Sequence, residues 1–176
     1  LSQKNMKEIN YVRHRMELGK DVYRTGRISN DRLDELCSVL LDFKRIMKEF
    51  GVTEYRASAT SVIRELEKRT LLLDRIFVKT GINIELLSNS ELRYLSYKSI
   101  ASQEKDFEKI IQKGTAIIDV GGGSIQISLF DKDCLVSTQN IRIGTNRLKE
   151  RLSNVFEQGS HFEQVVEEIA NNALKT

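Results

Sequence analysis

The sequence contains no proline and only two cysteines among its 176 residues. Proline usually makes up about 5% of a globular protein, so its absence favours a chain built from helices and short glycine turns. Cys37 and Cys134 lie far apart and make no metal-ligand spacing with His14 and His161. The spaced ligand sets of zinc sites are therefore excluded, and we interpret both cysteines as reduced, partly buried thiols.

Long apolar runs and a strong charge bias are absent as well. No stretch approaches the roughly 20 apolar residues that span a bilayer, and no basic-then-apolar leader opens the chain. We therefore expect a cytoplasmic protein without a membrane partner. The net charge of +3, from 28 basic and 25 acidic residues, is too small to indicate a specific nucleic-acid partner.

Basic residues are concentrated near the start of the sequence, between residues 13 and 27. They are Arg13, Arg15, Lys20, Arg24 and Arg27. A polyanion could bind there, and an ordinary solvated basic face explains the same pattern equally well. Because the sequence begins with Leu1 rather than methionine, we expect the natural N-terminus to lie upstream.

Hydrophobic periodicity divides the first 114 residues into alternating strands and helices. Ser29, Asn30 and Asp31 can cap the first helix, because their side-chain oxygens accept from first-turn amides. Gly51 and Gly81 end the first two helices, since glycine tolerates the left-handed conformation. The predicted order is a strand at residues 9–13, a helix at about 29–50, a strand at 54–59, a helix at 61–79, a strand at 82–87 and a helix from 88 or 90 to 102.

The pattern changes after Gly114. Three apolar stretches with short links predict antiparallel strands at 115–120, 124–130 and 135–143, followed by helices at 146–155 and 162–174. We therefore divide the chain into a first unit, 1–114, and a second unit, 115–176. The alternation in the first unit predicts an α/β fold, with a largely parallel or mixed sheet covered by helices.

A glycine loop joins the first two of these antiparallel strands. The apolar strand brings Asp119 to its end, and Gly121, Gly122 and Gly123 then permit positive φ and remove every Cβ atom. Successive amides of such a loop can converge on an anionic oxygen, with Ser124 adding a hydroxyl donor. Asp119 can hold a divalent cation beside the same anion. A tight hairpin with an incidental acid is the alternative, and a P-loop is excluded because no Gly-Lys-Ser/Thr follows.

Strand alternation gives the segment after the loop one polar side. We expect Gln126 to lie on that side and to point toward the anion site. The polar set is Ser124, Gln126 and Ser128, and the apolar set is Ile125, Ile127 and Leu129.

The segment from Asp119 to Ser124 resembles the second phosphate motif of the exopolyphosphatase/guanosine pentaphosphate phosphohydrolase family. Three further stretches resemble other family motifs in the same order. They are Ala59-Thr60-Ser61-Val62-Ile63-Arg64, then Ile84-Glu85-Leu86-Leu87-Ser88 leading to Glu91 and Arg93, then Ile141-Arg142-Ile143-Gly144-Thr145-Asn146-Arg147-Leu148. The resemblance covers nearly the whole sequence.

The resemblance implies an actin-like ATPase fold, also called ribonuclease H-like, with its site in a cleft between two lobes. Residues 1–114 would form the first lobe, a mixed sheet flanked by helices, and 115–176 the beginning of a similar second lobe. The implied activity is removal of terminal phosphate from polyphosphate or guanosine pentaphosphate with Mg²⁺ or another divalent cation. Such a family also implies a homodimer, although the sequence carries no interface signature.

The resemblance also implies a role for each matched residue. Asp119 would bind the metal and orient water, and Arg64 would grip phosphate, unless it is an ordinary helix-surface arginine. Gly144 and Thr145 would bring a second helix N-terminus to the anion, unless they form an ordinary strand-to-helix turn. The phosphate cradle would be Gly121, Gly122, Gly123 and Ser124.

Three departures from the family pattern weigh against full activity. The family's opening Asp-x-Gly-Ser-Asn-Ser motif is not found, so we expect the sequence to begin just after it. Alignment without a gap puts Glu91 and Leu92 at the family's Glu-Glu pair, whose second member is the general base; a one-residue gap would make Glu91 that base instead. Gln126 stands where the family has a third glutamate, and Ile125 where it has threonine.

Loss of a general base typically lowers a rate by about 10²–10⁴, so we expect weak or no hydrolysis with retained anion binding. Three functions stay open from the sequence. The first is a phosphohydrolase, impaired by Leu92 and Gln126 or using Glu91 as base. The second is a non-catalytic regulator that binds polyphosphate or guanosine penta- or tetraphosphate. The third is a sugar kinase or ATPase of the same superfamily, which would need an adenosine pocket.

Overall fold

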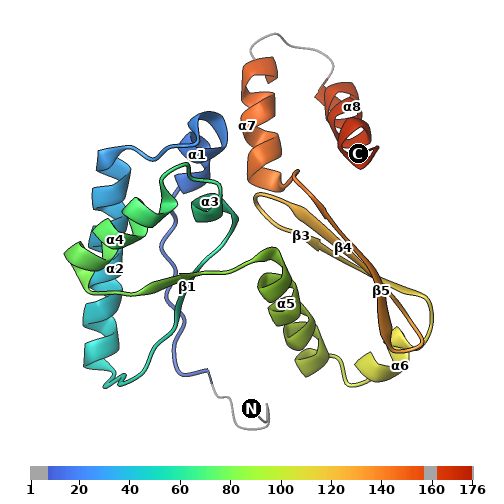
Figure 1. The fold of residues 1–176 in the computed structure, drawn as a ribbon, viewed down its shortest axis with the longest axis horizontal. Helices are drawn as coiled ribbons and strands as arrows, with labels where there is room; N and C mark the ends of the chain where they lie inside the picture. The colour runs from blue at the N-terminus through green and yellow to red at the C-terminus, as the bar shows by residue number, and fades with distance from the viewer. Residues whose placement is uncertain (1–7, 157–161, 176) are drawn as a thin grey trace.

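The computed structural model describes residues 8–156 and 162–175. Figure 1 shows two neighbouring parts, one formed by α1 to α4 with β1 and one formed by β3 to β5 with α7 and α8, while α5 and α6 lie beside the second sheet. The elements in chain order are α1 (Leu18–Thr25), α2 (Asn30–Glu49), β1 (Ala57–Ala59), α3 (Ser61–Arg64), α4 (Arg69–Thr80), β2 (Ile84–Leu86), α5 (Asn89–Gln103), α6 (Phe107–Ile111), β3 (Thr115–Val120), β4 (Ile125–Asp131), β5 (Cys134–Ile141), α7 (Thr145–Phe156) and α8 (Phe162–Leu174). The mixed α/β architecture predicted from the sequence is confirmed.

The first part is built around the parallel pair β1 and β2, in which Ala57 lies opposite Ile84 and Ala59 opposite Leu86. Helices α2 and α4 pack beside this pair and bury their apolar faces against it. The core consists of Val22, Leu33, Cys37, Ile63, Leu66, Leu72 and Ile76. Burial of such side chains is the main source of stability here, at roughly 25 cal/mol per Å² of apolar surface removed from water.

Helix boundaries follow the capping signals that the sequence contains. The Ser29 side chain accepts from the Arg32 amide at 3.3 Å and so caps α2, and Gly81 ends α4 at a φ of 68°. The predicted helix at 61–79 is wrong in one respect, because α3 ends at Arg64 and α4 begins at Arg69. The break between them places Leu66 in the core at 4% exposure.

Two predictions near the start of the chain also need correction. The strand predicted at 9–13 does not form, since residues 8–17 have no regular structure. Ile9 is 83% exposed there and Tyr11 72%, and a strand is stable only with a partner to accept its hydrogen bonds. Helix α1, which sequence reasoning missed, follows and ends at Gly26 with a φ of 68°.

The second part is the antiparallel meander β3-β4-β5. Its β4–β5 connection turns at Lys132 and Asp133, both with positive φ, as two-residue hairpin loops require. The polar side of β4 is the buried one, with Gln126 4% exposed and Ser128 2%. Helix α5 covers this side, where the Tyr97 hydroxyl donates to the Ser128 hydroxyl and the Tyr97 ring packs edge-on against Phe130 with 5.2 Å between ring centroids.

The division near Gly114 stays a prediction. Helix α5 precedes Gly114 in the sequence, yet it packs against the sheet of the second part through Tyr97. Residues 1–7 of the predicted first unit lie outside the described residues. Within the described ranges, no helix is both long enough and apolar enough to cross a membrane.

Candidate functional site

The glycine loop connects β3 to β4 in a tight bend, closed by a hydrogen bond from the Gly121 amide to the Ser124 carbonyl at 3.0 Å. None of its three glycines has a positive φ, so the prediction that they supply positive φ is wrong. The absence of a Cβ atom matters for space instead, most of all at Gly123 and Gly122. A Cβ atom on Gly123 would lie 2.7 Å from the Ser61 hydroxyl, and one on Gly122 would lie 2.8 Å from Nδ2 of Asn146.

The carbonyls of the loop are held by the beginning of α7. The Thr145 amide donates to Gly121 at 3.0 Å, and the Asn146 and Arg147 amides donate to Gly122 at 2.9 and 3.1 Å. Gly144 permits this approach, since a Cβ atom there would lie 2.5 Å from the Gly121 carbonyl oxygen. The first amides of α7 therefore donate to the loop carbonyls, and an approach of this helix N-terminus to an anion, through Gly144 and Thr145, stays a prediction.

Three amides of the loop, unlike its carbonyls, are not hydrogen-bonded within the described residues. Those of Gly122, Gly123 and Ser124 have no acceptor among the described residues. Partly buried amides usually find a partner in protein, water or ligand. Three consecutive free amides therefore form a candidate anion-binding site.

Asp119 lies at the start of this bend on β3 and is half-buried. Its Oδ2 atom accepts from the Ser96 hydroxyl of α5 at 2.9 Å. Gln126 is its cross-strand neighbour, so both side chains lie on the same side of the sheet, as strand alternation predicted. Gln126 Oε1 is buried and has no partner in the described part of the chain.

Other buried side-chain atoms, on α5 and β5, also lack partners in the described part of the chain. On α5 these are Oδ1 of Asn89 and Nε of Arg93, and on β5 the atom is Oδ1 of Asn140, which lies opposite Gln126. Each such atom costs about 1–3 kcal/mol unless water or ligand satisfies it. These atoms therefore favour a polar partner, water or ligand, beside the Asp119 and Gln126 side of the sheet.

The beginning of α5 gives Glu91 a structural role. Its carboxylate accepts from the Ser88 amide at 2.8 Å, while the Glu91 amide donates to the Ser88 hydroxyl at 3.1 Å. The hydrogen bond from the Ser88 amide lowers the pKa of Glu91 below its ordinary value, which makes it a weaker base. Leu92 and Ser96 are one helical turn apart and share the side that faces Asp119, whereas Glu91 is exposed. This geometry supports the ungapped alignment, and catalysis by Glu91 stays a prediction.

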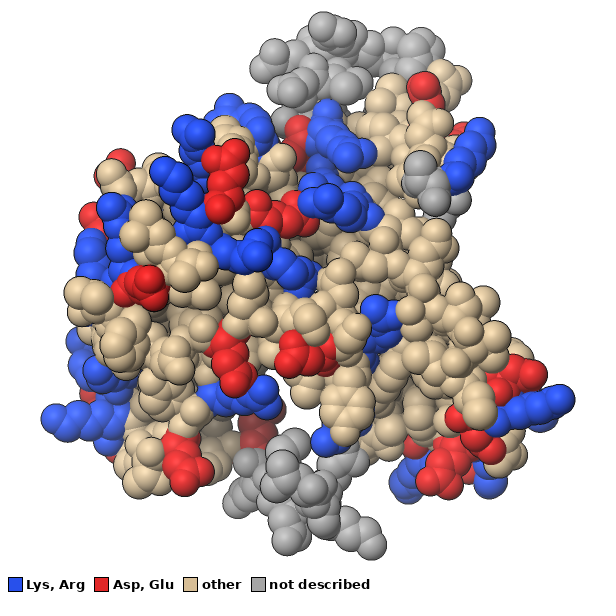
Figure 2. Space-filling model, in the orientation of Figure 1, with Lys and Arg blue, Asp and Glu red and all other residues tan. Residues whose placement is uncertain are grey.

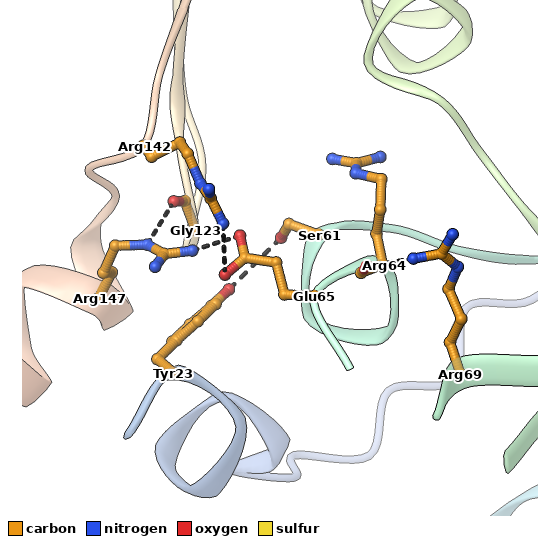
Figure 3. Close-up of polar contacts among 8 residues, drawn as sticks. All are labelled: Tyr23, Ser61, Arg64, Glu65, Arg69, Gly123, Arg142 and Arg147. Atoms are coloured by element: carbon orange, nitrogen blue, oxygen red, sulfur yellow. Dashed lines mark hydrogen bonds and ion pairs between the residues drawn. The ribbon is translucent and has the colours of Figure 1, made fainter. Parts of the chain in front are cut away.

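Arg64 is engaged within the first part of the molecule. Its Nη1 atom donates to the Leu87 carbonyl, just beyond β2, and no dashed line in Figure 3 joins its guanidinium to Gly123. The structure therefore does not bring Arg64 to the glycine loop. Contact between Arg64 and phosphate stays a prediction.

An ion-pair network that sequence reasoning missed joins α3 to α7 (Figure 3). The Glu65 carboxylate pairs with Arg147, and with Arg142 at 3.5 Å. Arg147 also donates from Nε to the Gly123 carbonyl at 3.1 Å and stacks 4.4 Å from the centre of the Tyr23 ring. The one available signal was the position of Arg147 within the matched stretch 141–148.

Basic side chains gather on the face shown in Figure 2, over α1 and the beginning of α7. Several of the arginines predicted to form a basic cluster are paired there or nearby. Arg24 lies 3.9 Å from Asp21, and Arg27 lies 3.2 Å from Glu67. These exposed pairs are worth little individually, so the face stays open to an anion.

A metal ion would find few ligands in the described ranges, where no group of three or more His, Cys, Asp or Glu residues gathers. Asp119 is a single carboxylate with the unpaired Oε1 of Gln126 beside it. Mg²⁺ commonly binds one or two carboxylates together with substrate phosphates and waters. The residues therefore fit a Mg²⁺ ion that arrives with a phosphate ligand.

Nearly the whole sequence matches one protein family. The model of the Ppx/GppA phosphatase family matches residues 2–175. The chain is 22% identical over 138 residues to a bifunctional 3-dehydroquinate synthase/phosphatase of Fusobacterium nucleatum, covering 77% of this chain and 20% of that protein. It is 29% identical over 107 residues to exopolyphosphatase 1 of Mycobacterium leprae, covering 59% of this chain and 30% of that protein.

Solved structures show the same similarity. The Ppx/GppA family member of Aquifex aeolicus superposes with a TM-score of 0.60 at 27% identity, covering 76% of this chain and 42% of that one. An exopolyphosphatase of Cytophaga hutchinsonii superposes with a TM-score of 0.62 at 26% identity, with the same two coverages. The chain therefore spans a fifth to a third of the curated relatives and less than half of these structures. The predicted actin-like fold is confirmed by these neighbours.

Proposed function

Because the chain belongs to the Ppx/GppA phosphatase family, we propose that its glycine loop binds the terminal phosphate of a phosphoanhydride chain. The observation that carries this proposal is the set of free amides at Gly122, Gly123 and Ser124. Amides that converge on a phosphate oxygen bind it without side-chain charge. Polyphosphate and guanosine pentaphosphate both present such a terminal phosphate.

Mg²⁺ is proposed to bind together with this phosphate. Asp119 would hold it directly or through water, with the Gln126 amide oxygen as a neutral second ligand. When bound, the metal would neutralise charge on the phosphate oxygens. Ser96 keeps the Asp119 carboxylate oriented through its hydrogen bond of 2.9 Å.

Hydrolysis by this site is proposed to be weak. Leu92 stands on the side of α5 that faces Asp119, at the position that the ungapped alignment gives to the family's general base. An aliphatic side chain cannot take a proton from water, and Gln126 cannot replace a carboxylate. Together these changes remove proton transfer and reduce the negative charge that would hold the metal.

A second function, phosphate binding without turnover, is favoured by the state of Glu91. Its carboxylate is engaged with the Ser88 amide and its pKa is lowered, so it is poorly suited to replace the missing base. The chain would then act as a sensor of polyphosphate or guanosine pentaphosphate. Binding in the absence of phosphate release would distinguish this function from hydrolysis.

The experiment measures phosphate release from polyphosphate with Mg²⁺ for the full-length protein and for the double variant Leu92→Glu/Gln126→Glu. We expect slow release by the wild type and at least about tenfold faster release by the double variant. Asp119→Asn in each background is the control, because it removes the metal-binding carboxylate. Rapid release by the wild type that depends on Asp119 would defeat the proposed impairment.

A further inference from the structure

The carbonyls of the glycine loop are all held from one side of the loop. Gly121, Gly122 and Gly123 each accept a hydrogen bond from α7, at distances between 2.9 and 3.1 Å. The donors are the backbone amides of residues 145–147 and the Nε atom of Arg147. One helix terminus therefore determines the orientation of three successive peptide groups.

The orientation of these carbonyls also determines where the loop amides point. In a planar trans peptide, each N–H is antiparallel to the carbonyl of the preceding residue. The N–H groups of Gly122, Gly123 and Ser124 must therefore point away from α7. These are the same amides that have no acceptor in the described residues. Helix α7 therefore orients the amides of the candidate anion site through hydrogen bonds on the opposite face of the loop.

Arg147 makes a different contribution from its neighbours. The carbonyls of Gly121 and Gly122 are held by backbone amides, whereas the Gly123 carbonyl is held by the Arg147 side chain. That side chain is itself fixed by the Glu65 carboxylate and the Tyr23 ring. It is 11% exposed, so it has little freedom to leave this position.

We propose that Arg147 is a positioning residue, which orients the Gly123–Ser124 peptide so that the Ser124 amide faces the bound phosphate. The proposal rests on phosphate binding by the loop, as proposed above. The positive charge of Arg147 is already compensated by the Glu65 carboxylate. Arg147 therefore acts through the Gly123–Ser124 peptide group rather than by contact with the anion. Lysine cannot replace it, because one ammonium group lacks the rigid fork that reaches Gly123 and Glu65 together.

The test compares Arg147→Lys with Arg142→Lys in the full-length protein. Arg142 pairs with the same Glu65 carboxylate but is 72% exposed and holds no loop carbonyl among the described hydrogen bonds, so it is a matched control. Calorimetry with tripolyphosphate and Mg²⁺ measures affinity. We expect affinity to fall at least about tenfold for Arg147→Lys, the usual effect of losing one strong hydrogen bond to an anion, and less than about twofold for Arg142→Lys.

Amide NMR supplies a readout that a general loss of stability would not imitate. During titration with tripolyphosphate, we expect the Ser124 amide resonance to shift in the wild type and to respond much less in Arg147→Lys. The Gly122 and Gly123 amides should still respond, because the carbonyls that precede them are held by backbone groups. Equal loss at all three amides would overturn a specific role for Arg147.

The remaining outcomes separate this inference from the function on which it rests. Wild-type protein that does not bind tripolyphosphate would overturn the proposed function and this inference with it. Binding that is unchanged in Arg147→Lys, or weakened equally in Arg142→Lys, would overturn the positioning role alone. If Arg147→Lys does not fold, the wild-type titration decides instead, because a Ser124 amide that fails to shift while Gly122 and Gly123 do would contradict the proposal.

Discussion

Two of the turns that the sequence marks as phosphate-binding differ in how their polar groups are hydrogen-bonded. At the glycine loop, the carbonyls of Gly121, Gly122 and Gly123 are engaged, and three amides have no acceptor within residues 8–156 and 162–175. At the turn that begins α3, the guanidinium of Arg64 is already bonded to the Leu87 carbonyl. The glycine loop therefore keeps donors for the anion that we propose, whereas Arg64 would have to exchange one partner for another.

The difference shows how contacts on one face of a loop can orient its peptide groups while the amides on the other face have no acceptor among the described residues. The helix α7 and the Arg147–Glu65 pair orient the glycine loop without occupying its amides. Comparable groups earlier in the chain, Arg64 of α3 and Glu91 of α5, are used in local structure instead. Four changes would break or sharpen this contrast.

The largest effect is expected from Gly144→Ala. The new methyl carbon would lie 2.5 Å from the Gly121 carbonyl oxygen and 2.5 Å from the carbonyl carbon of Gly122, so the loop and α7 must separate. We expect loss of tripolyphosphate binding by more than about 100-fold, since all three amides lose their orientation. Gly114→Ala is the control, because a Cβ atom there meets nothing within 4 Å. Calorimetry measures both variants, and retained binding in Gly144→Ala would show that α7 does not orient the loop.

The next largest effect is expected on stability, from the Glu65–Arg147 ion pair that joins the two parts of the molecule. Glu65→Ala removes the carboxylate that pairs with Arg147, whose side chain is only 11% exposed. We expect a loss of about 2–3 kcal/mol in the free energy of unfolding, somewhat less than for a fully buried pair. Urea denaturation measures this value. Glu85→Ala, which breaks an exposed pair with Arg56, should cost below about 1 kcal/mol, and similar values for both variants would contradict the importance of burial here.

A smaller effect is expected from Arg64→Gln in the first part. It removes the donor to the Leu87 carbonyl, so the free energy of unfolding should fall by about 1 kcal/mol. Affinity for tripolyphosphate should change by less than about threefold if Arg64 has only this structural role. A loss of tenfold or more, measured by calorimetry, would instead place Arg64 at the phosphate.

The smallest effect concerns Glu91 and pH. The pKa of Glu91 is lowered in the folded chain by its hydrogen bond from the Ser88 amide, so its ionised form stabilises the fold above the unfolded-state value of about 4.3. Lowering the pH through the folded pKa removes that contribution. We therefore expect Glu91→Gln to be less stable than wild type at neutral pH, and the difference to vanish in acid.

Urea denaturation of both proteins as a function of pH checks this expectation. The same variant also tests the alternative alignment, in which Glu91 is the general base. If Glu91 serves only as a cap, any phosphate release from polyphosphate should stay within about twofold of wild type. A loss of about 10² or more would restore Glu91 as the base.

Most of the secondary structure was predictable because its signals are local. The predicted strand at 115–120 coincides with β3. Of the residues proposed to begin the helices near 30 and 90, the structure uses Ser29 and Ser88 as caps. The strand at 9–13 failed because strand formation depends on a partner, which periodicity alone does not supply. The break after Arg64 was missed because it depends on where Leu66 is buried.

The sequence by itself determined the glycine loop, the place of Asp119 before it and the side of β4 on which Gln126 lies. These follow from glycine content and from the two-residue repeat of a strand, both properties of neighbouring residues. The tertiary structure decided which hydrogen-bonding groups remain free, because Gly121 and Thr145, or Glu65 and Arg147, are far apart in the chain. Only the tertiary position of α7 lets its amides donate to the loop carbonyls and lets Arg147 pair with Glu65 beside α3. The loop amides then have no acceptor among the described residues.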